Sequence, residues 1–366
     1  MKYYLIAGEA SGDLHGSNLI KQLKLQDPQA DIRCWGGDLM EQAGATVVKH
    51  YKDLAFMGFV EVVMNLRTIF KNLDLCKKDI EAWKPDVLVL IDYPGFNLRI
   101  AEWAKQQGLK VIYYISPQVW AWKEGRVKKI RETVDKMLVI LPFEKDFYKK
   151  WDFEVEYVGH PLIEAVKAAK EAPALPPFSD KPIIALLPGS RKQEVEKKLP
   201  VMLSMAKYFP EYQFIMAQAP SLEDSFINGF TGAYPNVSVV KGQTYPLLLQ
   251  ATAALVTSGT ATLETALFGV PEVVCYKGSP VSYFFAKHLI KVKYISLVNL
   301  IMDKPVVKEL IQHDLTEENL LKELTLILKD TARHQQMKAD YAMLWTLLGD
   351  GTASRKAAEA IVSMVK

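Results

Sequence analysis

The chain of 366 residues carries 45 basic and 42 acidic side chains, a net charge of +3, and 49% of its residues are hydrophobic. This length predicts two domains, and the ordinary balance of apolar and charged residues excludes a disordered, collagen-like or coiled-coil chain. The small basic excess argues against a protein built chiefly to bind nucleic acid.

Three widely spaced cysteines, Cys34, Cys76 and Cys275, form no paired motif. They predict neither a disulfide framework nor a zinc site, and they favour the cytoplasm as the compartment. The N-terminal apolar run ends at Glu9, which makes it too short for a signal peptide. Because no uncharged apolar stretch is long enough to span a bilayer, we expect any membrane contact to be peripheral.

The first half of the chain alternates short apolar runs with longer amphipathic stretches, a pattern typical of the strands and helices of a parallel sheet. Strands are predicted at residues 3–7, 87–92, 110–115 and 137–141, and helices at residues 17–25, 67–83, 98–107 and 143–150. The alternation predicts an α/β domain of Rossmann-like, doubly wound type over residues 1–168.

A proline-rich segment, residues 168–182, shows neither the periodicity of a helix nor that of a strand and is predicted to be a linker. A second series follows, with strands predicted at residues 183–187, 213–217, 237–240, 253–257 and 272–276, and helices at residues 194–209, 261–268, 281–289 and 317–328. We therefore expect a second Rossmann-like domain over residues 182–345, and a cleft facing the carboxyl ends of both sheets. The amphipathic tail, residues 353–366, is predicted to pack back on the first domain.

The turn GEASGD, residues 8–13, follows the first predicted strand directly. Its small residues would let a ligand approach the backbone, and the start of the next helix favours anionic or hydroxyl-rich groups. The candidate contacts are Gly8, Glu9, Ser11 and Gly12. A tight turn between strand and helix would need the same glycines, so both interpretations remain open.

Two further segments follow strands of the first domain. Asp92 comes directly after an apolar run, where its carboxylate could accept a proton as a general base or could cap the next helix. The segment SPQVWAW, residues 116–122, offers a polar amide at Gln118 and an aromatic wall at Trp120. Tryptophan is also common in protein cores, so Trp120 suits either role.

In the second domain, two turns are compatible with phosphate. Arg191 ends the motif LLPGSR after the strand at residues 183–187, where its guanidinium could bind phosphate oxygens. The motif SGTATLE follows the strand at residues 253–257, and its candidate ligand contacts are Ser258, Gly259, Thr260, Thr262 and Glu264. Hydroxyl groups at a helix start suit a diphosphate, and they also serve as ordinary helix caps.

A long apolar segment, residues 56–70, is flanked by lysines. An apolar stretch edged with cations suits an anionic bilayer or acyl chains, and core packing is the alternative. The residues that we assign to such a surface are Phe56, Met57, Phe59, Val60, Val63 and Phe70.

Eight motifs together resemble the lipid-A-disaccharide synthase family. They are, in chain order, GEASGD (8–13), MGFVEV (57–62), IDYPGFN (91–97), SPQVWAW (116–122), LPFEKDFY (141–148), LLPGSR (186–191), SGTATLE (258–264) and SLVNLI (296–301). The resemblance implies a GT-B fold and an inverting glycosyltransferase that uses neither metal nor cofactor. It implies transfer of 2,3-diacylglucosamine from its UDP derivative to the 6-hydroxyl of 2,3-diacylglucosamine 1-phosphate. The product would be the β-1,6-linked disaccharide of lipid A, made in the cytoplasm at the inner membrane of a Gram-negative bacterium.

The resemblance also implies roles for single residues. Asp92 matches the family's essential aspartate and Arg191 its essential arginine, which would offset charge on the departing UDP. On the donor side, the polar matches are Asn299, Glu309 and Gln312. Gly95 stands where many members have an aspartate, so no role of that acid transfers to this chain. The family's tail can exchange between protomers, which implies a homodimer.

Other functions fit parts of the same pattern. A peptidoglycan GlcNAc-transferase or a UDP-sugar epimerase would share the fold and the UDP-sugar. An NAD-dependent dehydrogenase is disfavoured because the first turn is not GxGxxG. A membrane-binding module without enzymatic activity would need no phosphate-compatible turns.

Overall fold

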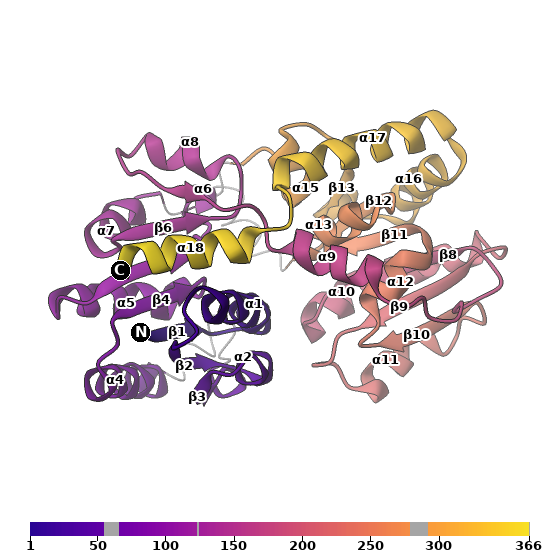
Figure 1. The fold of residues 1–366 in the computed structure, drawn as a ribbon. Helices are drawn as coiled ribbons and strands as arrows, with labels where there is room; N and C mark the ends of the chain where they lie inside the picture. Colours follow the sequence, from indigo (N-terminus) through magenta and orange to yellow (C-terminus); the bar gives the residue numbers. More distant parts are fainter. Residues whose placement is uncertain (55–65, 123, 279–291, 366) are drawn as a thin grey trace. The chain divides into compact units, whose positions relative to one another are not determined.

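The computed structural model describes residues 1–54, 66–122, 124–278 and 292–365. The chain divides into two compact units, Met1–Pro161 with Gly349–Lys366, and Leu162–Leu348. Figure 1 shows that each unit is built on its own sheet, with helices packed around it. None of the helices in the described part of the chain combines the length and the apolar character that crossing a bilayer requires.

The first unit contains a seven-stranded parallel sheet with the spatial order β3-β2-β1-β4-β5-β6-β7. Its strands are β1 (Lys2–Ala7), β2 (Asp31–Gly36), β3 (Thr46–His50), β4 (Val87–Ile91), β5 (Lys110–Tyr114), β6 (Lys136–Val139) and β7 (Glu156–Tyr157). The chain runs outward from β1 in one direction and from β4 in the other. Open α/β sheets bind ligands at such a switch point, beyond the carboxyl ends of the two central strands.

Helices bury both faces of this sheet. They are α1 (Ala10–Gln26), α2 (Asp38–Gln42), α4 (Leu66–Trp83), α5 (Pro94–Gln106), α6 (Val119–Trp122), α7 (Arg126–Thr133), α8 (Glu144–Lys149) and α18 (Ala353–Val365). Alternate strand residues such as Tyr4 and Leu88 share one core with α4, α5 and α7. Their neighbours Tyr3 and Leu5 are also fully buried, as expected for a parallel sheet covered on both sides.

The C-terminal helix belongs to the first unit. Helix α18 packs along α1, and Lys110 Nζ on β5 donates a hydrogen bond to Met364 O at 2.7 Å. In Figure 1 this helix, at the yellow end of the chain, lies within the unit that holds the N-terminus. The tail thus packs on α1 of its own chain here, and the homodimer expected from tail exchange remains a prediction.

The second unit contains a six-stranded parallel sheet with the order β10-β9-β8-β11-β12-β13. Its strands are β8 (Ile183–Leu187), β9 (Gln213–Gln218), β10 (Val237–Lys241), β11 (Ala251–Thr257), β12 (Glu272–Tyr276) and β13 (Lys308–Ile311). Its helices include α9 (Leu162–Glu171), α10 (Lys192–Leu203), α11 (Asp224–Thr231), α12 (Thr244–Gln250), α13 (Thr260–Phe268), α15 (Leu297–Met302), α16 (Glu317–Lys329) and α17 (Thr331–Leu348). The switch point lies between β8 and β11. Strand β8 ends within the motif LLPGSR, and strand β11 is followed directly by SGTATLE.

The division between the units falls after Pro161, ahead of the proline-rich segment at residues 168–182 that was predicted as the linker. Helix α9 packs on α12 and α13, and Lys170 near its end donates to Leu267 O at 3.0 Å. These contacts place α9 and the proline-rich segment inside the second unit, which therefore begins near residue 162. The helix predicted at residues 281–289 lies outside the described residues.

Candidate functional site

Asp92 directly follows β4 at the switch point of the first unit. Asp92 and Tyr93 both have left-handed backbone conformations, with φ of 45° and 51°, which residues other than glycine adopt only when the surroundings enforce it. Two side chains hold this turn, because Asp92 O accepts from Asn97 Nδ2 at 2.7 Å and from Tyr113 OH at 2.5 Å. The backbone that carries the Asp92 carboxylate is therefore fixed by bonds to α5 and β5.

The Asp92 carboxyl group is half-buried. Burial, and next the negative charge of Glu9, raise the pKa of Asp92 to about 6, while a hydrogen bond from the Tyr93 backbone lowers it. A carboxylate with a pKa near 6 is largely ionised at neutral pH and is a stronger base than an exposed aspartate. Its position and its pKa both suit general-base chemistry.

The glycines of GEASGD serve close packing. A Cβ atom on Gly8 would lie 2.3 Å from the Tyr93 ring, and one on Gly12 would lie 3.0 Å from Ala7 Cβ. Glu9 and Ser11 are exposed beside them. The structure thus gives the two glycines a packing reason that needs no ligand, and leaves the two polar side chains accessible.

Asp13, the last residue of GEASGD, has a role that the sequence did not reveal. Its buried carboxylate accepts hydrogen bonds from the backbone N–H groups of Gly37 at 2.8 Å, Leu39 at 3.2 Å and Met40 at 3.1 Å. These groups begin α2, where N–H groups otherwise lack partners. Asp13 therefore fastens α2 to the start of α1.

The segment after β5 rests on a buried polar cluster. Gln118 is exposed, whereas Trp120 is buried and packs edge-on against an aromatic ring of the next turn. Beneath them, Ser116 Oγ and Tyr148 OH share a hydrogen bond of 2.6 Å. Glu144 accepts from the Leu141 backbone N–H at 2.9 Å, and its burial raises its pKa to about 7. Of the two predicted contacts here, only Gln118 is accessible to a ligand within this unit.

In the second unit, a cavity of about 420 Å³ lies at the switch point. It brings together five of the predicted site residues, Arg191, Ser258, Gly259, Thr260 and Glu264. They come from two turns, one after β8 and one after β11, which the parallel register places side by side. The two turns that the sequence marked as compatible with phosphate thus line one cavity.

Arg191 stands at the rim of this cavity. Its guanidinium is 61% exposed and donates from Nη1 to Glu194 Oε1 at 3.1 Å. Gly189 has a φ of 114°, and a Cβ there would lie 2.7 Å from Glu194 Oε2, so the motif needs glycine at this position. An exposed arginine with a carboxylate partner can exchange that partner for a phosphate at low cost.

The turn after β11 presents backbone and hydroxyl groups. Gly259, with a φ of 143°, precedes α13, and Thr260 begins the helix with an exposed side chain. Thr262 is buried, and its hydroxyl donates to Gly259 O at 2.9 Å, so it braces the turn from inside. Ser258 donates to Ile295 O at 2.9 Å. Thr262 is thus the one predicted contact of this motif that does not line the cavity.

Asn299 and Glu309 bond directly to each other. Asn299 is 1% exposed; its Nδ2 donates to Glu309 Oε1 and to Val307 O, both at 2.9 Å, and its Oδ1 accepts from the Val307 N–H. Glu309 in turn accepts from the backbone N–H groups of Ile295 and Ser296. Because Ile295 O holds Ser258, this pair supports the cavity from behind, and its direct contact with a donor remains a prediction.

Gln312 lies elsewhere. It lines a separate cavity of about 410 Å³ with Lys197, Lys277 and His313, beyond the ends of β12 and β13. Among the described residues its buried Nε2 has no hydrogen-bond partner. The structure therefore does not bring Gln312 into the cavity that holds Arg191.

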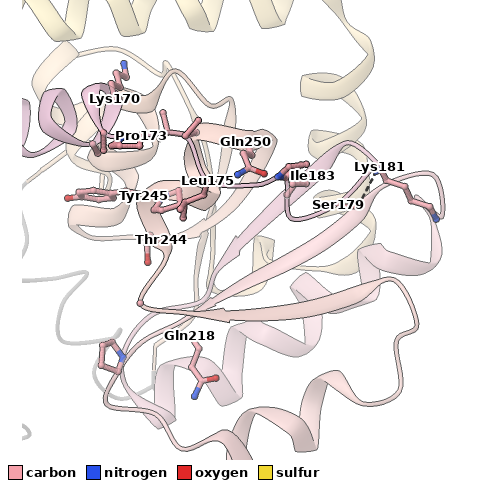
Figure 2. Close-up of a pocket in the computed structure, with 18 residues that line it drawn as sticks. Lys170, Pro173, Leu175, Ser179, Lys181, Ile183, Gln218, Thr244, Tyr245 and Gln250 are labelled. Carbon is pink, nitrogen blue, oxygen red and sulfur yellow. Dashed lines mark hydrogen bonds between the residues drawn. The ribbon is translucent and has the colours of Figure 1, made fainter.

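A larger cavity, of about 1000 Å³, is lined chiefly by α12 and the proline-rich segment. Figure 2 shows Leu175 of the proline-rich segment and Tyr245 of α12 on its walls. Thr244 lines both cavities, and Tyr245 OH donates to Glu264 Oε1 at 2.8 Å. Burial raises the pKa of Glu264, and this hydrogen bond partly offsets the effect. The wall of the larger cavity thus orients a carboxylate of the smaller one.

The predicted apolar surface is described only in part. Phe56, Met57, Phe59, Val60 and Val63 lie outside the described residues. Phe70, on the first turns of α4, is 54% exposed and has the Arg99 guanidinium 5.6 Å from its ring centre.

Two Rossmann-like units, with phosphate-compatible turns at the switch point of the second, define a protein of the GT-B class. Solved structures agree on the fold. UDP-GlcNAc 2-epimerase from Neisseria meningitidis bound to UDP-GlcNAc is 14% identical, with a TM-score of 0.70 over 99% of this chain and 100% of that chain. The glycotransferase of kitacinnamycin is 14% identical, with a TM-score of 0.69 over 100% and 99% of the two chains.

The sequence comparisons identify the family. The model of the lipid-A-disaccharide synthetase family matches residues 3–364. The lipid-A-disaccharide synthases of Geobacter metallireducens and Syntrophus aciditrophicus are each 40% identical, over 99% of this chain and 96% and 97% of theirs. That of Coxiella burnetii is 38% identical over 99% of this chain and 98% of its own. The chain belongs to the lipid-A-disaccharide synthase family, and it is a glycosyltransferase of lipid A biosynthesis.

Proposed function

We propose that the protein transfers 2,3-diacylglucosamine from UDP-2,3-diacylglucosamine to the 6-hydroxyl of 2,3-diacylglucosamine 1-phosphate, with inversion at the anomeric carbon. The observation that carries the proposal is the cavity at the switch point of the second unit, where Arg191 stands opposite the turn at Ser258–Thr260. Family membership supports the lipid A substrates, and the names of the relatives support the disaccharide product.

In the proposed reaction, the acceptor 6-oxygen bonds to the anomeric carbon while the bond from that carbon to the UDP oxygen breaks. The acceptor's hydroxyl proton passes to the Asp92 carboxylate, and UDP leaves with the bonding electron pair. Asp92 suits the base because its pKa of about 6 lies just below neutral pH. Arg191 and the N–H groups that begin α13 would stabilise the negative charge that accumulates on UDP.

The direct test is the reaction itself. The purified protein is incubated in detergent with UDP-2,3-diacylglucosamine, with and without 2,3-diacylglucosamine 1-phosphate, and UDP release and product mass are followed. We expect UDP release that depends on the acceptor and a tetra-acylated disaccharide 1-phosphate, unchanged by EDTA. Epimerised UDP-sugar without acceptor, or transfer to a peptidoglycan lipid precursor instead, would overturn the proposal.

Asp92→Asn tests the role of the base. The amide keeps the size of the side chain but accepts no proton, so we expect turnover to fall about 100-fold or more while UDP affinity stays within about twofold. Equal losses of turnover and UDP affinity would indicate a structural role for Asp92 instead.

We further propose that the protein works in the cytoplasm, bound peripherally to the inner membrane through the first unit. Phe70 and Trp122 support this, because they are 54% and 49% exposed and lie in the first turns of α4 and at the end of α6. Arg99 lies 5.6 Å from the Phe70 ring centre and Arg126 lies 5.8 Å from that of Trp122. Exposed aromatic rings next to cations suit the boundary of an anionic bilayer.

Flotation with phosphatidylglycerol vesicles tests the membrane contact. We expect the double variant Phe70→Glu, Trp122→Glu to bind these vesicles at least several-fold less than the wild type, because each change puts a negative charge at the proposed surface. Met343→Glu is the matched control, since Met343 is an exposed apolar residue of the second unit. Equal binding of all three proteins would exclude this surface.

A further inference from the structure

Lys198 is a buried cation next to the cavity of the second unit. It lies on α10, the helix that follows LLPGSR, and only 2% of the residue is exposed. Its Nζ donates to Thr257 Oγ1 and lies 3.8 Å from Glu194 Oε2. Burying an ammonium group is costly unless it is paired, so its retention here calls for a reason.

Glu194 lies between two cations. One carboxylate oxygen accepts from Arg191 at the exposed rim, and the other faces the buried Lys198. Glu194 and Thr257 both line the cavity, whereas Lys198 lies behind them. Arg191, Glu194 and Lys198 together carry a net charge of +1. The buried positive charge is that of Lys198, which lies behind the wall of the cavity.

Two consequences follow for an anion that enters the cavity. Because Thr257 Oγ1 accepts from the ammonium group, the Thr257 hydroxyl proton is left to donate to another acceptor, and Thr257 lines the cavity. Because Glu194 keeps Lys198 as a partner, Arg191 can turn from Glu194 to a phosphate without leaving a carboxylate unpaired. Burial lowers the pKa of Lys198, and the charge of Glu194 opposes that effect.

We propose that Lys198 is a positioning residue for the diphosphate of the donor. It acts through Thr257, whose hydroxyl it orients, and through Glu194, whose charge it balances when Arg191 binds phosphate. This inference rests on the proposed function for the identity of the anion as a nucleoside diphosphate. Lys198 itself does not line the cavity.

Lys198→Met tests the proposal, because methionine has a similar length and no charge. Binding of UDP and of uridine to the full-length protein is measured by calorimetry. We expect the Kd for UDP to rise about 10-fold or more, and the Kd for uridine, which lacks phosphates, to stay within about twofold. Equal weakening of both ligands would indicate a merely structural role, and unchanged UDP binding would also overturn the proposal.

Thr257→Val tests the same contact from its other side if Lys198→Met does not fold. Valine keeps the shape of threonine without its hydroxyl, so we expect the same selective loss of UDP binding. The double variant should lose no more than about the larger single effect, since Lys198→Met already breaks the path through Thr257. Additive losses, or selective loss in neither variant, would contradict the proposal.

Lys207→Met is the matched control. Lys207 is exposed and pairs with Glu317 at 2.7 Å, away from the cavity, so its loss removes one positive charge from the same unit. We expect UDP binding by this variant to match the wild type. Wild-type protein that binds inorganic pyrophosphate but not UDP would overturn the proposed function alone, and the Lys198 comparison would then be made with pyrophosphate.

Discussion

Asn97 donates its side-chain amide to the backbone carbonyl oxygen of Asp92 at 2.7 Å. The same Nδ2 lies 3.2 Å from Ile91 O and 3.4 Å from Ile6 O, so one buried amide joins the carboxyl ends of β1 and β4. Asn97, the last residue of IDYPGFN, thus supports the backbone of Asp92, the only acidic residue of the same motif. The left-handed turn at Asp92 depends on this contact and on Tyr113.

Asn97→Ala should therefore reduce activity through Asp92. We expect kcat to fall about 10-fold or more and the free energy of unfolding to fall by about 1 to 3 kcal/mol, because buried carbonyl groups lose their donor. Turnover assays and urea unfolding measure the two effects. Tyr113→Phe removes the other donor to Asp92 O and should also lower kcat. Wild-type kcat in both variants would show that the turn at Asp92 needs neither hydrogen bond.

The rate should fall below about pH 6. A general base must be deprotonated, and the pKa of Asp92 is raised to about 6, partly by the negative charge of Glu9. Glu9→Gln removes that charge, so the acidic limb of the kcat/KM profile should move to lower pH. Glu102→Gln, which removes an exposed carboxylate of α5, should leave the limb in place. A limb that moves equally in both variants would exclude a specific effect of Glu9.

Stability should depend on pH through Glu144. Its pKa in the folded protein is about 7, above its ordinary value of 4.5, because the group is buried. The neutral form is favoured in the fold, so this contribution is fully present below about pH 4.5 and is lost as the pH rises to about 7. The loss is about 3 kcal/mol at most.

Glu144→Gln should remove that part of the pH dependence, since an amide does not titrate. Urea unfolding at pH 5 and pH 8 measures it: the difference between the two pH values should be smaller in the variant by about 1 to 3 kcal/mol. Identical differences in the two proteins would mean that Glu144 titrates alike in the folded and the unfolded chain, so that its pKa is not raised in the fold.

Asn299→Asp should be more harmful than Asn299→Ala. The aspartate would place a second carboxylate against Glu309, whereas alanine only removes hydrogen bonds. We expect UDP affinity to fall in both variants because Ile295 and Ser258 lose their support, and to fall further in Asn299→Asp at neutral pH. Calorimetry with UDP tests this order. Unchanged UDP affinity in both variants would show that the Asn299–Glu309 pair does not support the cavity.

The sequence predicted the strands that lie at the centres of the two sheets. β4 and β8 are continuous apolar runs, and β11 contains one at residues 253–256, as buried parallel strands require. Strands β2 and β3 were not predicted, because Asp31, Arg33 and Lys49 interrupt their apolar pattern at the edge of the sheet. Helix α5 begins at Pro94, four residues before its predicted start, because proline suits the first turn and Tyr93 takes the left-handed cap.

The site residues predicted from the pattern of strands were those that follow strand ends, which mark ligand sites in parallel sheets, whereas Asn299, Glu309 and Gln312 came from the family resemblance. The supporting residues could not be found in this way. Lys198 is 59 positions from Thr257 along the chain, and Tyr113 is 21 positions from Asp92. Only the spacing of Glu194 and Lys198, one helical turn apart, gave a local signal, and the same spacing is common on exposed helix faces.

The position of α18 has a consequence for how the protein is made. The second unit is one continuous stretch, Leu162–Leu348, all of which precedes α18 along the chain. The first unit includes residues 1–161 but lacks α18, the helix that packs along α1, until residues 353–365 leave the ribosome. The half of the molecule that is synthesised first is therefore the half that completes its fold last, and until then the surface of α1 that α18 covers stays open to other chains.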